Sequence, residues 1–175
     1  MVIVSAPKDA SSPTKPLLSP EPHIRAAEQA DADAIVRLVA GFARVGEMLP
    51  VTHASIRSAI PRFTVVETAG TVIGCGALFD WGDGSAEIRS LAVNHRYAGL
   101  GIGRMLVDHL TRRAEATEAE TLFAMTLKPG FFERLGFERV ARSRMPAKID
   151  GDCTGCAFRE GCREVAMWRA LTVTS

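Results

Sequence analysis

The sequence predicts an α+β fold in which one central sheet, mixed but mostly antiparallel, is flanked by helices. Three short runs rich in Val, Ile and Leu, at residues 63–67, 72–79 and 86–93, are separated by glycine-containing turns, which is typical of antiparallel strands. On either side of these runs, apolar residues recur at helical spacing in stretches that start near Asp31 and Ile102. At 175 residues, the chain has the length of one domain.

The chain before the first strand differs in composition from the rest. Residues 1–22 combine five prolines with Ser, Lys and Thr, and such a segment cannot bury enough apolar surface to offset its chain entropy. We therefore predict a disordered tail over residues 1–22 and a single folded domain over residues 23–175.

One strand and two helices are predicted ahead of the three central strands. Residues 23–27 form the strand, Asp31 caps the first helix, and residues 52–60 form a short second helix closed by Pro61. The first helix places four apolar residues on one face: Ile35, Leu38, Val39 and Phe42.

The elements after the central strands begin with a third helix, which has Ile102, Leu106 and Leu110 on one face. A buried strand at residues 121–127 follows, and then a brief helix that ends at Gly136. The chain closes with a strand pair at residues 137–142 and 164–171.

The most informative stretch is the turn between the strand at residues 86–93 and the third helix. Arg96, Gly99, Gly101 and Gly103 mark this turn. Glycines let backbone N–H groups approach a ligand closely, and the positive end of the helix dipole favours a bound diphosphate. The pattern indicates a phosphate cradle, with a purely structural tight turn as the alternative. It lacks the first-strand setting of a dinucleotide-binding fold, because several strands precede it.

Two motifs resemble the GNAT superfamily of N-acetyltransferases. The signature of that superfamily, Q/R-x-x-G-x-G/A after the fourth strand, is met by RYAGLG at residues 96–101. GFFERLGF at residues 130–137 is similar to the family's ending F-Y-E-K-L-G-F. The segments GCGAL, AEIRSLAV and FFERLGF resemble those of the short bacterial glutamate N-acetyltransferases, which catalyse the first step of arginine biosynthesis.

The resemblance implies acetyl-coenzyme A (acetyl-CoA) as cosubstrate, with its pantetheine arm lying along the fourth strand like an added strand. A backbone N–H at Leu91 or Ala92 would stabilise the oxyanion while an amine attacks the thioester directly, so no covalent enzyme intermediate is needed. The implied cofactor-binding residues are Leu91, Ala92, Val93, Arg96, Gly99, Leu100, Gly101, Ile102, Gly103, Arg104 and Phe132.

The acceptor amine must be unprotonated to attack, and Glu87 is the candidate base. Arg89 lies on the same face of the strand and could bind a substrate carboxylate, although an ion pair with Glu87 explains the same residue. Lys128 and Lys148, each in a predicted loop, are further candidates for carboxylate contacts, with surface solvation as the alternative. L-glutamate is the favoured acceptor; another small amine or a protein N-terminus is the alternative.

Three positions depart from the family pattern. Phe132 replaces a common Tyr that can protonate the leaving thiolate, so no general acid is assigned. Ala98 replaces a frequent Arg, which removes one phosphate contact. Val51 stands after Pro50 where the glutamate-acetylating group has Arg, and this difference counts against L-glutamate as the acceptor. The missing Tyr leaves open a non-catalytic module that senses acyl-CoA or a metal.

Three cysteines, Cys153, Cys156 and Cys162, lie within ten residues of one another. They could hold zinc or form a redox-sensitive disulfide. A fourth zinc ligand could come from one of three residues: Cys75, Asp152 or Glu164. The second C-x-x-C pair is missing, so we favour structural thiols and predict no metal.

Charge and composition narrow the partners. The chain has 21 Lys and Arg against 20 Asp and Glu, so no positive excess argues for nucleic acid or an anionic membrane. No apolar run approaches the roughly 20 residues that cross a bilayer, and no secretory leader is visible. We expect a cytoplasmic protein whose partners are acetyl-CoA and a small amine, with a homodimer as an open alternative.

Overall fold

The computed structural model describes residues 20–156 and 159–172. Seven strands form one sheet in the order β1-β2-β3-β4-β5-β7-β6. Every neighbouring pair is antiparallel except β4 and β5, which are parallel. The predicted fold class, a mixed and mostly antiparallel sheet flanked by helices, is confirmed.

The elements agree with the predicted ones to within a few residues, apart from α5. The strands are β1 (His23–Ala26), β2 (Phe63–Thr68), β3 (Thr71–Asp80), β4 (Ser85–Val93), β5 (Thr121–Thr126), β6 (Glu138–Val140) and β7 (Val165–Ala170). The helices are α1 (Ala32–Ala43), α2 (His53–Ala59), α3 (Ile102–Glu115), α4 (Pro129–Glu133) and the one-turn α5 (Pro146–Lys148).

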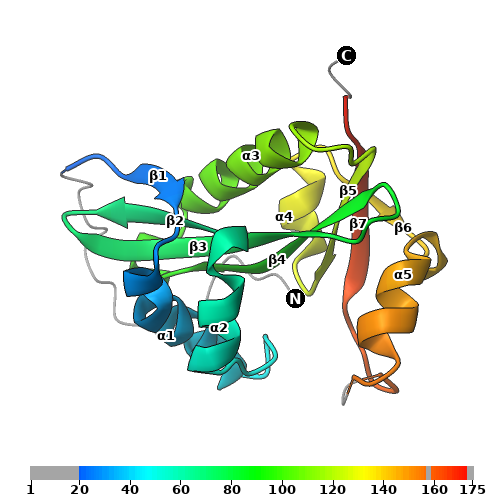
Figure 1. Cartoon of the computed structure of the whole chain (residues 1–175), viewed down its shortest axis with the longest axis horizontal. Helices are drawn as coiled ribbons and strands as arrows, with labels where there is room; N and C mark the ends of the chain where they lie inside the picture. The colour runs from blue at the N-terminus through cyan, green and yellow to red at the C-terminus, as the bar shows by residue number, and fades with distance from the viewer. Residues whose placement is uncertain (1–19, 157–158, 173–175) are drawn as a thin grey trace.

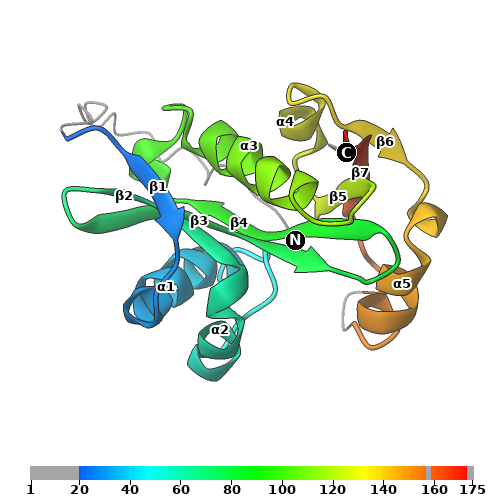
Figure 2. The ribbon, with the colours of Figure 1, turned by 45° about the horizontal axis from the view of Figure 1, so that its top comes forward.

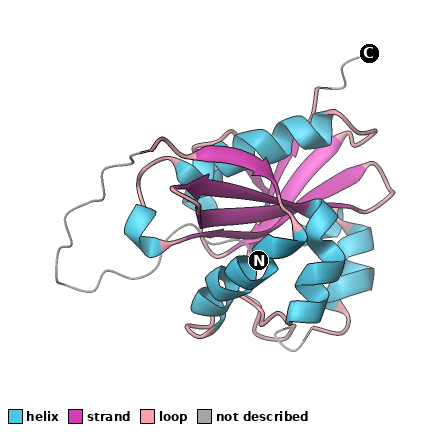
Figure 3. Cartoon of the chain, turned by 60° about the vertical axis from the view of Figure 1, so that its left-hand side comes forward, coloured by secondary structure: helices cyan, strands magenta, loops and turns pink. Residues whose placement is uncertain are grey.

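The sheet lies between two layers of helices (Figure 1 and Figure 2). Helices α3 and α4 cover one face and α1 and α2 cover the other, as the side view in Figure 3 also shows. Helix α3 packs very closely on β3, because a Cβ atom at Gly76 would lie only 2.9 Å from Leu110 Cδ1. A separate apolar cluster fills each interface, with Leu91 in the α3 cluster and Ala92 in the α1–α2 cluster.

Strands β4 and β5 stay together for only a short distance. Their register pairs Ser85, Ala86 and Glu87 with residues 121–123, and within the described chain no later β4 residue pairs with β5. Strand β4 also contains a bulge opposite Gly76, where Ser90 has a φ of 50°. The parallel strands therefore separate beyond Glu87.

One local expectation holds only in part and another is wrong. Asp31 is the N-cap residue of α1 as predicted, but its side chain makes no capping hydrogen bond to that helix, because its carboxylate accepts from the Glu28 N–H (2.8 Å) and pairs with Arg25 (2.6 Å). Lys148 does not lie in a loop, because it ends α5 and leads into a π-helical turn at Ile149–Cys153. The sequence pattern between β6 and β7 predicted neither helical turn, since each spans less than two turns.

The structure describes only the end of the predicted tail. Its last three residues, 20–22, are described, and the Pro20 carbonyl accepts a hydrogen bond of 2.6 Å from Thr68 Oγ1 on β2. Residues 1–19 lie outside the described part, so the tail stays a prediction there. In residues 20–156 and 159–172, no helix is long and apolar enough to cross a membrane.

Candidate active site

A cavity of about 540 Å³ lies where the two parallel strands end, between the start of α3 and α4. Gly101 is the N-cap residue of α3 and has a φ of 83°, a conformation that glycine adopts with little strain. Helix α3 is 14 residues long, and its N-terminus presents backbone N–H groups and a positive dipole end beside the cavity. These features fit a bound diphosphate.

Six of the predicted cofactor-binding residues line this cavity: Val93, Gly99, Gly101, Ile102, Gly103 and Arg104. Arg96 and Leu100 do not line it. Phe132 is fully buried and packs edge-on against Phe131 and Phe137, so its neighbour Phe131 faces the cavity in its place.

Six further lining residues were not assigned from the sequence: Tyr97, Ala98, Gly130, Phe131, Arg134 and Leu135. Four of them come from α4 and the residues just after it, which pack beside α3 so that Arg104 Nη2 lies 3.4 Å from the Arg134 carbonyl. All four belong to the GFFERLGF motif, which is the sequence signal that points to them. Lys128, assigned to the acceptor, also lines this cavity and lies 3.7 Å from Glu47 Oε1.

The side chains of Leu91, Ala92 and Val93 are buried, so a ligand beside this strand would meet backbone groups. The three residues are 0%, 0% and 2% exposed, and their side chains enter the two apolar clusters. Their strand has already separated from β5, so among the described residues this part of the β4 edge has no pairing with β5. An extended chain can add to such an edge through main-chain hydrogen bonds.

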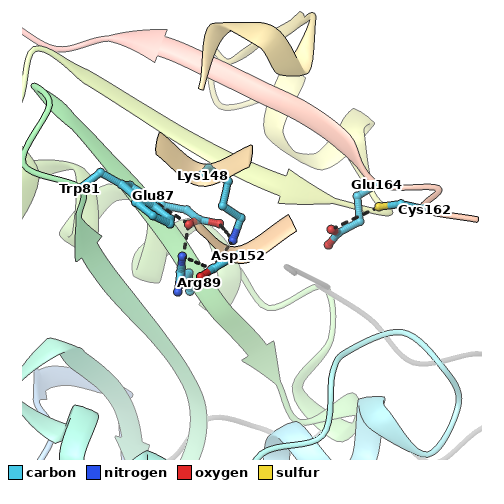
Figure 4. A network of polar contacts seen from close by, with 7 residues as sticks. All are labelled: Trp81, Glu87, Arg89, Lys148, Asp152, Cys162 and Glu164. Atoms are coloured by element: carbon cyan, nitrogen blue, oxygen red, sulfur yellow. Dashed lines mark hydrogen bonds and ion pairs between the residues drawn. The ribbon is translucent and has the colours of Figure 1, made fainter. Parts of the chain in front are cut away.

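Glu87 lies fully buried on β4, at the point where the strands part. Its Oε2 atom accepts hydrogen bonds from Arg89 Nε (2.6 Å) and Trp81 Nε1 (3.1 Å), and its Oε1 atom lies 3.0 Å from Lys148 Nζ (Figure 4). Glu87 and Arg89 therefore share one face, as strand alternation predicted, and Lys148 joins them from the segment between β6 and β7.

Asp152 completes this cluster of charges. Its Oδ2 atom lies 2.5 Å from Arg89 Nη2 and 2.9 Å from Lys148 Nζ. Partial burial opposes ionisation, but Lys148 and Arg89 together hold the pKa of Asp152 below its ordinary value. Arg89 also stacks over the Phe79 ring, with 4.1 Å from its guanidinium carbon to the ring centroid. The sequence suggests Asp152 only as a possible zinc ligand, so its place beside Arg89 and Lys148 is a finding of the structure.

A second cavity, of about 420 Å³, opens beside this cluster. Lys148 and Asp152 form part of its wall, together with Leu49 from the loop after α1 and the three cysteines Cys153, Cys156 and Cys162. All three thiols are free, and burial raises the pKa of Cys153. The charged residues of its wall are Lys148 and Arg163, together with Asp152 and Glu164.

The described residues contain no group of three or more His, Cys, Asp or Glu side chains placed to hold a metal ion. Cys75 is remote from the other thiols in packing: it lies in the α1–α2 cluster, and burial raises its pKa to about 12. Glu164 lies near Cys162, with its Oε2 atom 3.8 Å from Cys162 Sγ (Figure 4). Of the candidate fourth ligands, Asp152 is instead engaged by two cations.

A sheet that opens between two parallel strands, with a glycine-rich helix N-terminus at the end of the opening, defines a coenzyme A-dependent acyltransferase. The family model of the acetyltransferase (GNAT) domain matches residues 59–139. An uncharacterized N-acetyltransferase of Chlorobaculum tepidum is 41% identical over 152 residues, which covers 85% of this chain and 96% of that protein. The chain belongs to the GNAT acetyltransferase family and is an acetyl-CoA-dependent N-acetyltransferase.

Two further comparisons show similarity to a particular group of acetyltransferases. An amino-acid acetyltransferase of Mycobacterium tuberculosis is 32% identical over 146 residues, covering 81% of this chain and 78% of that protein. The structure of N-acetylglutamate synthase from Neisseria gonorrhoeae, complexed with coenzyme A and N-acetyl-glutamate, superposes with a TM-score of 0.79 at 24% identity. The superposition covers 86% of this chain and 35% of the longer synthase chain. At this sequence identity the similarity is evidence for the fold alone. The predicted membership of the GNAT family and the predicted acetyltransferase activity are both confirmed.

Proposed function

We propose that the enzyme acetylates the amino group of a small amino acid, with L-glutamate as the favoured acceptor and arginine biosynthesis as its setting. The observation that carries the proposal is the pair of cations Arg89 and Lys148 beside the buried Glu87. Both contact the same carboxylate oxygen, Asp152 Oδ2, and so mark a position for a carboxylate. The similarity to an amino-acid acetyltransferase supports the same class of acceptor.

The acetyl donor takes the opening between β4 and β5 in this proposal. Its diphosphate binds at the N-terminus of α3, where Arg104 and the glycine turn line the first cavity. Its pantetheine arm runs along the free edge of β4 and uses backbone groups of Leu91, Ala92 and Val93. A backbone N–H at Leu91 or Ala92, next to the bulge at Ser90, stabilises the oxyanion.

The acceptor occupies the second cavity, with its carboxylate at Arg89 and Lys148 and its amine toward Glu87. Glu87 removes a proton from the ammonium group, directly or through one water molecule. The free amine attacks the thioester carbonyl carbon, the nitrogen of the tetrahedral intermediate gives its extra proton to solvent, and the carbon–sulfur bond breaks to release the amide and the thiolate of coenzyme A. Solvent then protonates the thiolate, because Phe132 has no acidic proton and is buried.

Mass-spectrometric detection of acetylated product tests this proposal, since the protein's own thiols would react with a thiol-sensing dye. The panel contains L-glutamate, L-glutamine, an amine without a carboxylate and a peptide N-terminus. We expect turnover of L-glutamate, reduced at least about tenfold in Arg89→Ala through a raised KM, because a charged hydrogen bond is lost. Turnover of only the carboxylate-free amine or the peptide would reject the acceptor class.

A further inference from the structure

We propose that Asp152 sets the affinity of the site for a carboxylate-bearing acceptor: its carboxylate holds Arg89 and Lys148 until the carboxylate of the acceptor takes its place. The inference rests on the proposed function, because it assumes that these two cations receive the acceptor. To the proposed site it adds Asp152, which competes with the acceptor carboxylate for the position between Arg89 and Lys148.

The contacts show a closed set of two cations and two carboxylates. Arg89 and Lys148 each contact both Glu87 and Asp152, at distances from 2.5 to 3.0 Å. The two contacts of Asp152 converge on a single oxygen atom, Oδ2. A substrate carboxylate that bound between the same cations would need the same position.

Only one of the two carboxylates can leave. The side chain of Asp152 is 46% exposed, whereas that of Glu87 is 0% exposed and sits within the sheet. Releasing Asp152 returns an ion to water, where it is well solvated, but releasing Glu87 would strand an unpaired charge in the protein interior. Asp152 also belongs to a five-residue π-helical turn on a segment that joins two strands, outside the sheet ladder.

The exchange takes place at the wall of the second cavity. Asp152 and Lys148 both line that cavity, and Arg89 lies 2.5 Å behind Asp152, so an acceptor carboxylate that displaces Asp152 from the cavity wall meets both cations. Replacing one carboxylate by another leaves the cluster neutral. An amine without a carboxylate offers no replacement and does not compete with Asp152, so Asp152 affects only the binding of acceptors that carry a carboxylate.

The test compares Asp152→Asn with the unmodified enzyme in steady-state kinetics. The asparagine keeps the shape of the side chain and loses its charge. We expect the KM for L-glutamate to fall roughly five- to tenfold with kcat within about twofold, because a partly exposed ion pair that competes with substrate is removed. Turnover of a carboxylate-free amine should gain no comparable advantage.

Asp150→Asn is the matched control, since it makes the same charge change two residues earlier and Asp150 has no ion pair with another described residue. It should leave both constants within about twofold. A KM for L-glutamate that is unchanged or raised in Asp152→Asn would overturn the proposal. A lower kcat at constant KM would also overturn it, because Asp152 would then act in the chemical step.

A binding measurement separates this inference from the proposed reaction. Isothermal titration of the coenzyme A-saturated protein with glutarate, which has no amine, reports carboxylate binding without turnover. Tighter binding to Asp152→Asn than to the unmodified protein and the Asp150→Asn control supports the inference even if no amine is acetylated. Equal or weaker binding to the variant contradicts it, whatever the kinetics show.

Discussion

Ser90 shows how one residue changes what a strand presents. Its φ of 50° marks the bulge in β4, where two residues oppose Gly76. Before the bulge, Ile88 faces the α3 cluster; after it, Leu91 does, so the alternation shifts by one residue. Glu87 and Arg89 keep their shared face because both precede the bulge.

Glu87 is the residue on which the proposed chemistry depends. In Glu87→Gln, the isosteric amide cannot take a proton from the acceptor, so we expect kcat to fall about 10²- to 10⁴-fold. The KM for the acceptor should change far less, because Arg89 and Lys148, the two proposed contacts of its carboxylate, are both kept. Steady-state kinetics with the preferred amine measures both constants. A kcat within about twofold of the unmodified enzyme would assign the proton transfer elsewhere.

Gly101 tests the start of α3 as the diphosphate site. An alanine there would have to adopt a φ near 83°, which costs about 1–2 kcal/mol and disturbs the turn. We expect Gly101→Ala to weaken coenzyme A binding in isothermal titration and to lower the free energy of unfolding. Gly41→Ala is the control: Gly41 lies in α1, and its added methyl group would meet nothing within 4 Å. A Gly101→Ala protein that binds coenzyme A normally would argue against this site.

At the scale of elements, Arg25 joins three of them. From β1, it pairs with Asp31 before α1 (2.6 Å) and with Glu67 on β2 (2.7 Å). Asp31 is 7% exposed, and its contact with Arg25 holds its pKa below the ordinary value. This interaction fixes the edge strand β1 to the start of α1.

Asp31→Asn should therefore lose stability in a pH-dependent way. Because the pKa of Asp31 is lower in the folded chain, its contribution is present above the unfolded value of about 3.9 and disappears as the pH falls through the folded value. Urea denaturation at pH 7 should show a loss of roughly 1–3 kcal/mol, and the difference from the unmodified protein should narrow near pH 3. A deficit that is the same at both pH values would assign the effect to something other than this charge.

At the scale of the whole molecule, the thiols fall into two environments. Cys75 is fully buried and burial raises its pKa to about 12, whereas Cys153, Cys156 and Cys162 line the second cavity. We expect a thiol-alkylating reagent to label the three cavity cysteines in the folded protein and Cys75 only after unfolding, because the thiolate is the reactive form. Peptide mass spectrometry identifies the labelled sites. Labelling of Cys75 at the rate of the others would contradict this packing.

The local sequence determined much of this protein. Hydrophobic periodicity located the seven strands and α1 to α4, and RYAGLG located the turn that precedes α3. Strand alternation placed Glu87 beside Arg89, since residues two apart share a face. These features depend on neighbours within a few residues, which is why the amino-acid pattern predicts them.

The tertiary structure decided which residues complete the site. The order β4-β5-β7-β6 brings the segment between β6 and β7 across β4, so Asp152 reaches Arg89 although 63 positions separate them. The same packing turned Phe132 into the core and Phe131 toward the first cavity. Such contacts depend on how the strands are ordered and how the core is filled, and no local periodicity encodes a pairing at that separation.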